Sequence, residues 1–429
     1  MGNFNLLNLS TNFIDFGVQK MPEVELGWIE TIIKWLIEGV GIIGLGIVLF
    51  TLILKTIVLP LDIYSRYKMK KQSLLMKAMR PDMEKLQKQY ANDKQMYNQK
   101  VMELQKAHGI SMFGACIPMI ISLAIFMTVF TSFSFYSQYA NLESYRGMEK
   151  AYNSVVENYV LCDIDEDGNY SDKIVEDGFL IRKMDDSVGE YAYLVDFDAF
   201  VKKADYGDEE TKKFNDLSED GKRVIVLNYV REGARKASAD YYRDNTNDFL
   251  WVKNIWYPDS ALNKELPDFS SFSSSISRVS SGLGAAYEES YTEVTWYLLS
   301  DDGYNPTGHA LEGKRVNGYF ILIVLAIGLM FLQQFISMRA QKDANELSTV
   351  DGSGARNNKW MLILMPIIYG IFSFFYSAAF STYMITNTVY SLITTVVLNK
   401  IMDVKFAKKV ASGELFNNKK KINNRKRLK

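Results

Sequence analysis

The sequence predicts an all-α polytopic membrane protein with five transmembrane helices, a cytoplasmic helical hairpin and an inserted extracytoplasmic α+β domain of unknown fold. Three observations support this class. Although the chain of 429 residues is only 48% hydrophobic, its apolar residues cluster in four long stretches. Basic and acidic segments alternate between these stretches. One acidic segment, 137–317, is long enough to be a folded domain.

Each of the four apolar stretches can cross a hydrocarbon core of ~30 Å, which requires about 20 apolar residues. The first three are predicted to form single transmembrane helices at 40–61, 111–136 and 318–338. The fourth is about twice as long as one span requires. We therefore expect it to form two helices, at 360–379 and 380–399, joined by a tight turn.

Charge predicts the orientation of these spans, because short cytoplasmic segments carry an excess of Lys and Arg. Segment 62–110 has 11 basic and 5 acidic residues, and the tail 400–429 has 11 and 2. Segment 137–317 has 20 basic and 35 acidic residues. We therefore place 1–39 and 137–317 outside the cell. The hairpin, the linker 339–359 and the tail then lie in the cytoplasm, and the chain crosses the plasma membrane several times.

Several function classes lack their sequence signals. The first 25 residues have no basic region or cleavage site of a signal peptide. Two cysteines, Cys116 and Cys162, exclude a disulfide framework. The two histidines, His108 and His309, are too few to suggest a metal site. No nucleotide-binding loop, zinc-protease motif or catalytic triad is visible, so we expect neither an enzyme nor a cofactor.

Two helical segments flank the first span. Residues 28–38 place Trp28 and Trp35 on one face and charges mostly on another. This pattern is typical of an amphipathic helix in the membrane interface, and an N-terminal extension of the span is the alternative. Segment 62–110 should form two helices separated at Asn92–Asp93. Its methionines either pack these helices together or offer an adaptable surface to partners. They are Met69, Met76, Met79, Met83, Met96 and Met102.

The inserted segment 137–317 contains signals for both strands and helices. Apolar alternation at 191–197 predicts a strand, and 222–243 is expected to be helical. The Ser/Gly-rich stretch 270–284 is typical of a loop or linker. Residues 163–169, DIDEDGN, imitate the start of a calcium loop, but position twelve is Ile174, which cannot ligate the ion. We therefore expect an acidic surface turn there.

Lys55 is the unusual residue of the first span. A charge near the middle of a bilayer costs about 2.5–3.5 kcal/mol on insertion scales, so it normally faces a protein interior or a wet cavity. No Asp or Glu lies within the four apolar stretches to neutralise it. Lys55 could therefore bind negative charge in a wet groove. Alternatively, its long stem could reach the cytoplasmic interface near Pro60.

Other polar residues in the spans fit the same groove. Thr51 precedes Lys55 by about one helical turn. The others form a stripe along the last span and a pair in the third, namely Asn387, Ser391, Thr394, Thr395, Gln333 and Gln334. Polar residues on one face can instead join helices by hydrogen bonds. Both roles stay open for Ser391, Thr394 and Thr395.

Six segments carry motifs that occur in one order along more than half of the chain. They are VLFTLILKTIVLPL (48–61), MKAMRPDMEKLQ (76–87), GACIPMIISLAIFMTVF (114–130), FLWVKNIWYPD (249–259), FLQQFIS (331–337) and LMPIIYGIFSFFYSAAFSTYMITNTVYS (364–391). Together they resemble the YidC insertases, relatives of the mitochondrial Oxa and chloroplast Albino proteins. The resemblance implies five core helices around a hydrophilic groove that is open to the cytoplasm and lipid and closed to the outside.

The resemblance also implies a function and a set of residues. The expected function is that of a membrane protein insertase and chaperone, which inserts and folds nascent membrane proteins through a positively charged groove. Lys55 takes the charged role, and the other matching groove positions are Thr51, Tyr383, Asn387, Gln333 and Gln334. Pro60, Pro118 and Pro366 match motif prolines and are predicted to form structural turns.

Three features depart from the family pattern. Lys55 stands where relatives usually have Arg, which keeps the charge but loses the planar guanidinium. The turn at 375–380, FYSAAF, lacks the family's Pro and Gly. The insertion that begins at 137 is far longer than the usual loop, and the resemblance says nothing about its role.

The basic tail predicts additional partners. Its charge suits ribosomal RNA or anionic lipid head groups, and a Sec-type translocon is a further candidate partner. The tail residues expected to contact the ribosome are Lys419, Lys420, Lys421, Arg425, Lys426 and Arg427. A transporter or channel with an anion-binding site at Lys55 is the alternative function. Transporters usually show repeated halves with breaks at corresponding positions, and this sequence shows neither.

Overall fold

The structure is a computed structural model in which the chain divides into two compact units. Unit 1 comprises Met1–Glu25, Ser137–Asn247 and Lys264–Val316, and unit 2 comprises Leu26–Tyr136, Asp248–Asn263 and Asn317–Lys429. The residues described are 16, 18–108, 116–165, 169–185, 190–299, 316–340, 364, 366–368, 370–371 and 373–412.

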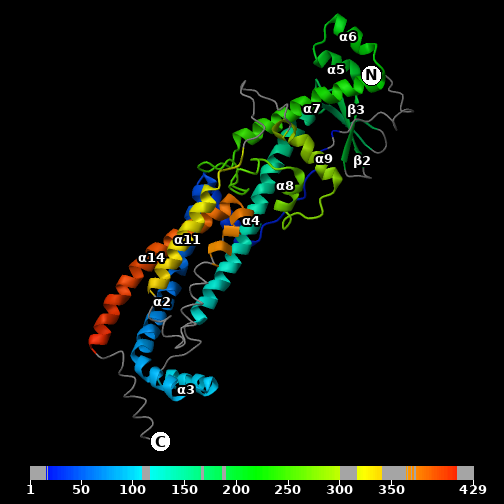
Figure 1. Ribbon diagram of the computed structural model, residues 1–429. Coiled ribbons are helices and arrows are strands. Elements are labelled where there is room, and N and C mark those ends of the chain that lie inside the picture. Colours follow the sequence, from blue (N-terminus) through cyan, green and yellow to red (C-terminus); the bar gives the residue numbers. More distant parts are fainter. Residues whose placement is uncertain are drawn as a thin grey trace. The chain divides into compact units, whose positions relative to one another are not determined.

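Unit 2 is built from long helices. Its helices in Figure 1 include α1 (Trp28–Glu38), α2 (Ile43–Gln89), α3 (Lys94–Ala107), α11 (Ile321–Ala340) and α14 (Ala378–Ala411). Helix α14 packs along both α2 and α11. A further helix, α4 (Cys116–Glu157), begins in unit 2 and ends in unit 1.

Helix α2 is continuous through the predicted first span and the first half of the predicted hairpin. Its 47 residues correspond to a length of about 70 Å, more than twice the hydrocarbon thickness. Pro60 and Pro81 lie inside it. The structural turn predicted at Pro60 is therefore wrong. Pro60 removes one backbone donor, and the hydrogen bonds of the neighbouring turns are sufficient to continue the helix.

Two helices of the described residues are long and apolar enough to cross a membrane. They are Ile43–Gln89 and Ile321–Arg339, which contain most of the predicted first and third spans. A shorter apolar helix, Pro366–Phe375, lies in the predicted fourth span and begins at one of the predicted prolines. The number of five crossings stays a prediction.

The hairpin at the end of α2 forms as expected. Asp93 caps α3, because its Oδ1 accepts hydrogen bonds from the backbone of Gln95 and Met96 at 3.1 and 2.9 Å. Three of the six methionines, Met76, Met79 and Met83, are buried, and Val101 and Leu104 of α3 pack against their cluster. Met96 and Met102 are exposed. The packing interpretation therefore holds for the three buried methionines, and a partner surface at Met96 and Met102 stays a prediction.

Helix α1 is amphipathic in the way its sequence predicts. Trp28 and Trp35 are 76% and 74% exposed, whereas Ile33 and Ile37 are buried against the rest of unit 2. The exposed tryptophan face is consistent with a position in the membrane interface, which stays a prediction.

Residues 248–263, here called the clamp, return to unit 2 between two segments of unit 1. Asp259 is fully buried in the clamp. Its carboxylate accepts hydrogen bonds from the backbone N–H groups of Tyr319 and Leu322 at 2.7 and 2.6 Å. These donors lie at the N-terminus of α11, where helix N–H groups lack partners within the helix. Asp259 therefore caps α11.

The clamp contacts the other long helices in a similar way. The backbone N–H groups of Ala378 and Ala379, which begin α14, donate to the carbonyl oxygens of Tyr257 and Ile255 at 2.8 Å each. The Phe249 ring lies so close to Gly44 of α2 that a β-carbon there would overlap it. The FYSAAF turn, which has no Pro or Gly, is thus stabilised by the clamp.

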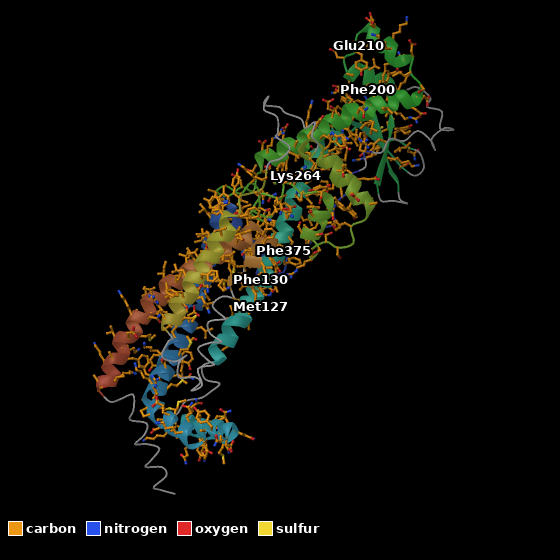
Figure 2. All side chains as sticks on the ribbon, viewed as in Figure 1. Met127, Phe130, Phe200, Glu210, Lys264 and Phe375 are labelled. Atoms are coloured by element: carbon orange, nitrogen blue, oxygen red, sulfur yellow. The ribbon has the colours of Figure 1, made fainter. Side chains whose placement is uncertain are left out.

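Aromatic rings also pack against this turn. The Phe130 ring of α4 lies 5.7 Å from the ring of Tyr376 and 5.3 Å from that of Phe380 (Figure 2). Tyr376 and Ser377 separate the preceding helical segment from α14. The Ser377 side chain accepts a hydrogen bond from the Phe380 N–H and so caps α14.

Unit 1 combines a small sheet with short helices. Strands β1 (Val160–Ile164) and β2 (Leu180–Asp185) pair in parallel, and β3 (Glu190–Val195) pairs antiparallel with β2. The helices are α5 (Phe197–Lys203), α6 (Asp208–Asn215), α7 (Glu219–Asp244), α8 (Phe269–Ser275), α9 (Ala285–Val294) and α10 (Trp296–Leu299). The expected strand at 191–197 and helix at 222–243 are confirmed by β3 and α7.

The predicted loop at 270–284 is partly wrong. Most of α8 lies within it, because Asp268 caps the helix through a hydrogen bond from Ser271 N–H at 2.8 Å and Phe272 is buried in the core. The acidic stretch at 163 is also paired rather than free. The Asp163 carboxylate receives two hydrogen bonds from Arg182, at 2.7 and 3.0 Å. Asp163 thus belongs to β1, and because 166–168 lie outside the described residues the expected surface turn stays a prediction.

The core of unit 1 draws on all three of its chain segments. Large side chains in it include Phe16, Met21, Tyr152, Phe179, Phe200, Phe214, Phe272 and Tyr291. Figure 2 shows Phe200, which lies 5.2 Å from Phe179 and 5.4 Å from Phe214 between ring centroids. Burial of these rings contributes much more to stability than surface ion pairs do.

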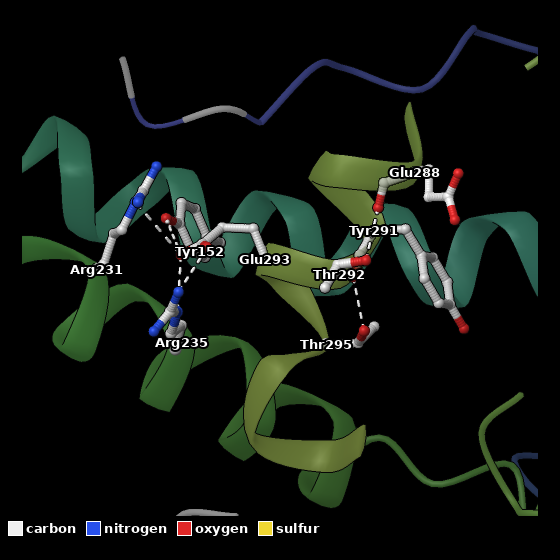
Figure 3. Close-up of polar contacts among 8 residues, drawn as sticks. All are labelled: Tyr152, Arg231, Arg235, Glu288, Tyr291, Thr292, Glu293 and Thr295. Carbon is white, nitrogen blue, oxygen red and sulfur yellow. Dashed lines mark hydrogen bonds and ion pairs between the residues drawn. The ribbon is translucent and has the colours of Figure 1, made fainter. Parts of the chain in front are cut away.

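A hydrogen-bonded network joins three helices of unit 1 (Figure 3). Glu293 of α9 receives two hydrogen bonds from Arg235 of α7, at 2.8 and 2.6 Å, and one from the Tyr152 hydroxyl of α4 at 3.0 Å. Burial and the nearby Glu293 carboxylate raise the pKa of Tyr152 well above its usual value. Tyr152 therefore acts only as a neutral donor in this network.

Candidate functional site

Lys55 lies on α2 and is half-buried. Near Lys55 the helix has one buried side and one exposed side. One face is buried against the rest of unit 2 and includes Ile47, Phe50 and Thr51. The opposite side exposes apolar residues such as Leu52. The Thr51 hydroxyl donates to the Ile47 carbonyl oxygen at 2.7 Å. Thr51 therefore shares the side of α2 that leads to Lys55, and its own donor is satisfied within the helix.

Two charged residues missed by the sequence analysis lie along α2 near Lys55. Asp62 and Arg66 are the two charges whose electrostatic fields act on the Lys55 ammonium group. Asp62 stands one residue beyond the predicted first span, so it does not belong to any of the apolar stretches. Arg66 Nη2 donates to Thr395 Oγ1 on α14 at 2.7 Å. Helical periodicity counted onward from Lys55 could have identified both residues.

Tyr383 is buried in an aromatic cluster that joins three helices. Its ring centroid lies 5.5 Å from that of Phe133 on α4 and 6.4 Å from that of Phe50 on α2. Phe50 and Phe133 are themselves stacked at 6.1 Å. This cluster brings α14, α4 and α2 together, and its α2 member, Phe50, directly precedes Thr51 in the sequence. The role of Tyr383 in lining a groove stays a prediction.

The polar stripe on α14 is partly satisfied within its own helix. The hydroxyl groups of Thr394 and Thr395 donate to the carbonyl oxygens of Tyr390 and Ser391, at 2.9 and 2.5 Å. Thr395 is buried and accepts the hydrogen bond from Arg66, so it joins two helices. Asn387, Ser391 and Thr394 are only half-buried.

The remaining predicted residues are distributed along other elements. Gln333 and Gln334 are half-buried on α11, which packs against α14. Pro118 lies within α4, and Pro366 is buried. The linker 339–359 from residue 341 onward, His309 and the six basic tail residues at 419–427 lie outside the described residues. In the part of the chain that is described, no group of three or more His, Cys, Asp or Glu could hold a metal ion.

Comparisons with known proteins agree with the resemblance. The pattern of the 60Kd inner membrane protein family matches residues 35–156 and 240–406. The chain is similar to proteins named membrane protein insertase YidC. The similarity is 40% identity over 91 residues to that of Fusobacterium nucleatum, which covers 21% of this chain and 42% of the relative. It is 30% over 119 residues to that of Geobacter sulfurreducens, 26% of this chain and 22% of the relative.

A third relative shows the same level of similarity. The membrane protein insertase YidC of Paraburkholderia phytofirmans is 35% identical over 120 residues, which cover 25% of this chain and 21% of the relative. The matching parts span less than half the length of each of these three relatives. The family match has a gap at 157–239, within the large insertion.

Proposed function

The chain belongs to the 60Kd inner membrane protein family, and from this membership we propose that it is a membrane protein insertase and chaperone. The observation that carries the proposal is a cation, Lys55, half-buried in the apolar part of α2, a helix that packs along α14. The substrates proposed are nascent membrane proteins. The relatives named as insertases support this reading.

The proposed mechanism begins with charge. A lysine in an apolar helix attracts an acidic or polar segment of the substrate, because the low local dielectric strengthens their attraction. The half-buried polar residues of α14 would keep that segment hydrated. They include Asn387, Ser391 and Thr394.

Release into lipid follows from the exposed apolar faces of the same helices. Leu49, Leu52 and Ile57 are exposed on α2, and Val324 and Leu332 are exposed on α11. A hydrophobic substrate span that slides along such a surface loses contact with water and gains contact with lipid. The chemistry requires no covalent step.

The experiment that tests this function changes the sign of the charge. We expect Lys55→Glu to abolish insertion of substrates whose translocated tail is acidic, because the groove would then repel it. Lys55→Arg keeps the positive charge and should retain activity. The measurement is rescue of a cell depleted of its own insertase. Full rescue by Lys55→Glu would contradict the proposal.

Topology and further partners belong to the same proposal. The N-terminus lies outside and the C-terminus in the cytoplasm, as the charge distribution of the short segments indicates. The basic tail binds the ribosome or anionic lipids, and a Sec-type translocon is a further partner. The alternative, a transporter or channel with an anion site at Lys55, gains no support from the named relatives.

A further inference from the structure

Three charged residues, Lys55, Asp62 and Arg66, lie along one face of α2 and are here called the ladder. Asp62 follows Lys55 by seven residues, and Arg66 follows Asp62 by four. Both spacings return a side chain to the same helical face. The fields of Asp62 and Arg66 both reach the Lys55 ammonium group. This face of α2 therefore carries positive, negative and positive charge in that order.

The ladder ends against α14. Arg66 Nη2 donates to Thr395 Oγ1 at 2.7 Å, and Thr395 is 1% exposed. The Arg66 guanidinium is thereby held between two packed helices instead of extending into solvent. Its charge stays close to the cytoplasmic end of the proposed groove, one helical turn beyond Asp62.

Asp62 forms no fixed salt bridge with Lys55 or with Arg66 in the described part of the chain. Among the residues that the structure describes, no Lys, Arg or His nitrogen forms an ion pair with its carboxylate. The carboxylate is half-buried on the same helix as both cations. It therefore acts on them through its field, without the close geometry of a fixed salt bridge.

We propose that Asp62 is a tethered counter-ion of the groove cations and sets how acidic a substrate segment must be in order to bind. This inference rests on the proposed insertase function. Lys55 and Arg66 supply two positive charges, and Asp62 cancels one of them. A substrate carboxylate must compete with Asp62 for the same two cations. Weakly acidic tails then bind poorly, and strongly acidic tails are selected.

The size of the effect follows from the spacing. Seven residues of helix separate two side chains by about 10 Å. At an effective dielectric constant of ~20, a unit charge at that distance changes the binding of a charged partner by roughly tenfold. Removing Asp62 should therefore alter which substrates are inserted, with little change for those that are already strongly acidic.

The test uses the full chain in proteoliposomes and a single-span substrate whose translocated tail carries no, one or several aspartates. For Asp62→Asn we expect insertion of the one-aspartate tail to rise roughly tenfold, which flattens the dependence on tail charge. For Arg66→Gln we expect the opposite shift. Asp62→Glu keeps the charge and should behave like the unaltered protein.

Two control variants separate charge from packing. Glu84→Gln removes an exposed acid of α2 that pairs with Arg80, and should leave the dependence on tail charge unchanged. Thr395→Val removes the acceptor of Arg66 but leaves its charge, so it should not reproduce the shift of Arg66→Gln. If Thr395→Val did reproduce that shift, the contact and not the charge would be responsible.

The outcomes distinguish this inference from the function on which it rests. Unchanged dependence in Asp62→Asn, together with a block in Lys55→Glu, would overturn the counter-ion role and leave the insertase function standing. Absence of insertion by the unaltered protein with every tail would overturn the proposed function itself. An altered dependence in Asp62→Asn but not in Asp62→Glu would support the inference.

Discussion

One buried residue, Asp259, caps the start of the long helix α11 of unit 2. Asp259 accepts two hydrogen bonds from the start of α11 and one from the Trp251 indole at 3.3 Å. Charged acceptors at a helix N-terminus benefit from the unpaired N–H groups and the helix dipole. Gly318 is the residue that allows this approach, because a β-carbon there would overlap the Asp259 carboxylate.

We therefore expect Gly318→Ala to destabilise unit 2 by about 1–3 kcal/mol, the usual cost of an added methyl group without space. The matched control is Gly328→Ala, within α11 itself, where a β-carbon meets nothing within 4 Å. It should leave stability unchanged or raise it, since Ala favours helix more than Gly. Thermal unfolding of the purified protein in detergent measures both. Equal stability of the two variants would contradict the expected overlap.

Helices α2 and α14 pack together beyond their predicted membrane spans. The Tyr67 and Phe406 rings lie 5.1 Å apart, and Met402 and Phe406 form a small buried cluster with Tyr67 and Leu74 packed against it. A salt bridge between Lys70 and Asp403 lies on the surface. Exposed ion pairs contribute about 0–1 kcal/mol, so the buried Phe406 ring is the main stabilising contact. The first hairpin helix and the segment preceding the basic tail thus form one packed pair.

Phe406→Ala should separate this pair, because removal of a buried ring costs about 3 kcal/mol or more. We expect faster amide hydrogen exchange in the part of α2 near Tyr67 and in the end of α14. Val404→Ala is the control, because Val404 lies on the same helix but is 62% exposed. Exchange that is equally slow in both variants would show that the contact does not hold the pair together.

The two units alternate along the whole chain. Unit 1 comes from three separate segments, and the clamp at 248–263 interrupts it. Because the clamp hydrogen-bonds to the starts of α11 and α14, it belongs to the helical unit by its contacts. A deletion of the large insertion must therefore spare the clamp.

This organisation predicts different outcomes for two deletions. Replacement of 1–25, 137–247 and 264–316 by short linkers removes unit 1 and keeps the clamp, and should preserve rescue of an insertase-depleted cell. Removal of the continuous segment 137–316 also takes the clamp and should abolish rescue, because the N-terminal groups of two helices lose their partners. Equal rescue by both deletions would show that the clamp is dispensable.

Several elements could be predicted because their signals are local. The amphipathic helix at 28–38, the Asp93 cap and helix α7 depend on periodicity and capping within a few residues. The family resemblance could also be predicted, since its motifs lie within single segments. The turn predicted at Pro60 and the loop predicted at 270–284 were wrong or partly wrong because both rested on local propensity alone. A propensity signal is weak, and the hydrogen bonds of a long helix or one buried ring such as Phe272 override it.

By itself the sequence determined the apolar stretches, the position of Lys55 within the first of them and the family to which the chain belongs. Only the tertiary structure showed that Arg66 reaches Thr395, 329 residues away in the chain, and that the clamp holds the starts of α11 and α14. Such contacts depend on how distant helices pack, and helical periodicity restricts only the face on which a residue lies. The partner on the opposing helix is decided by packing.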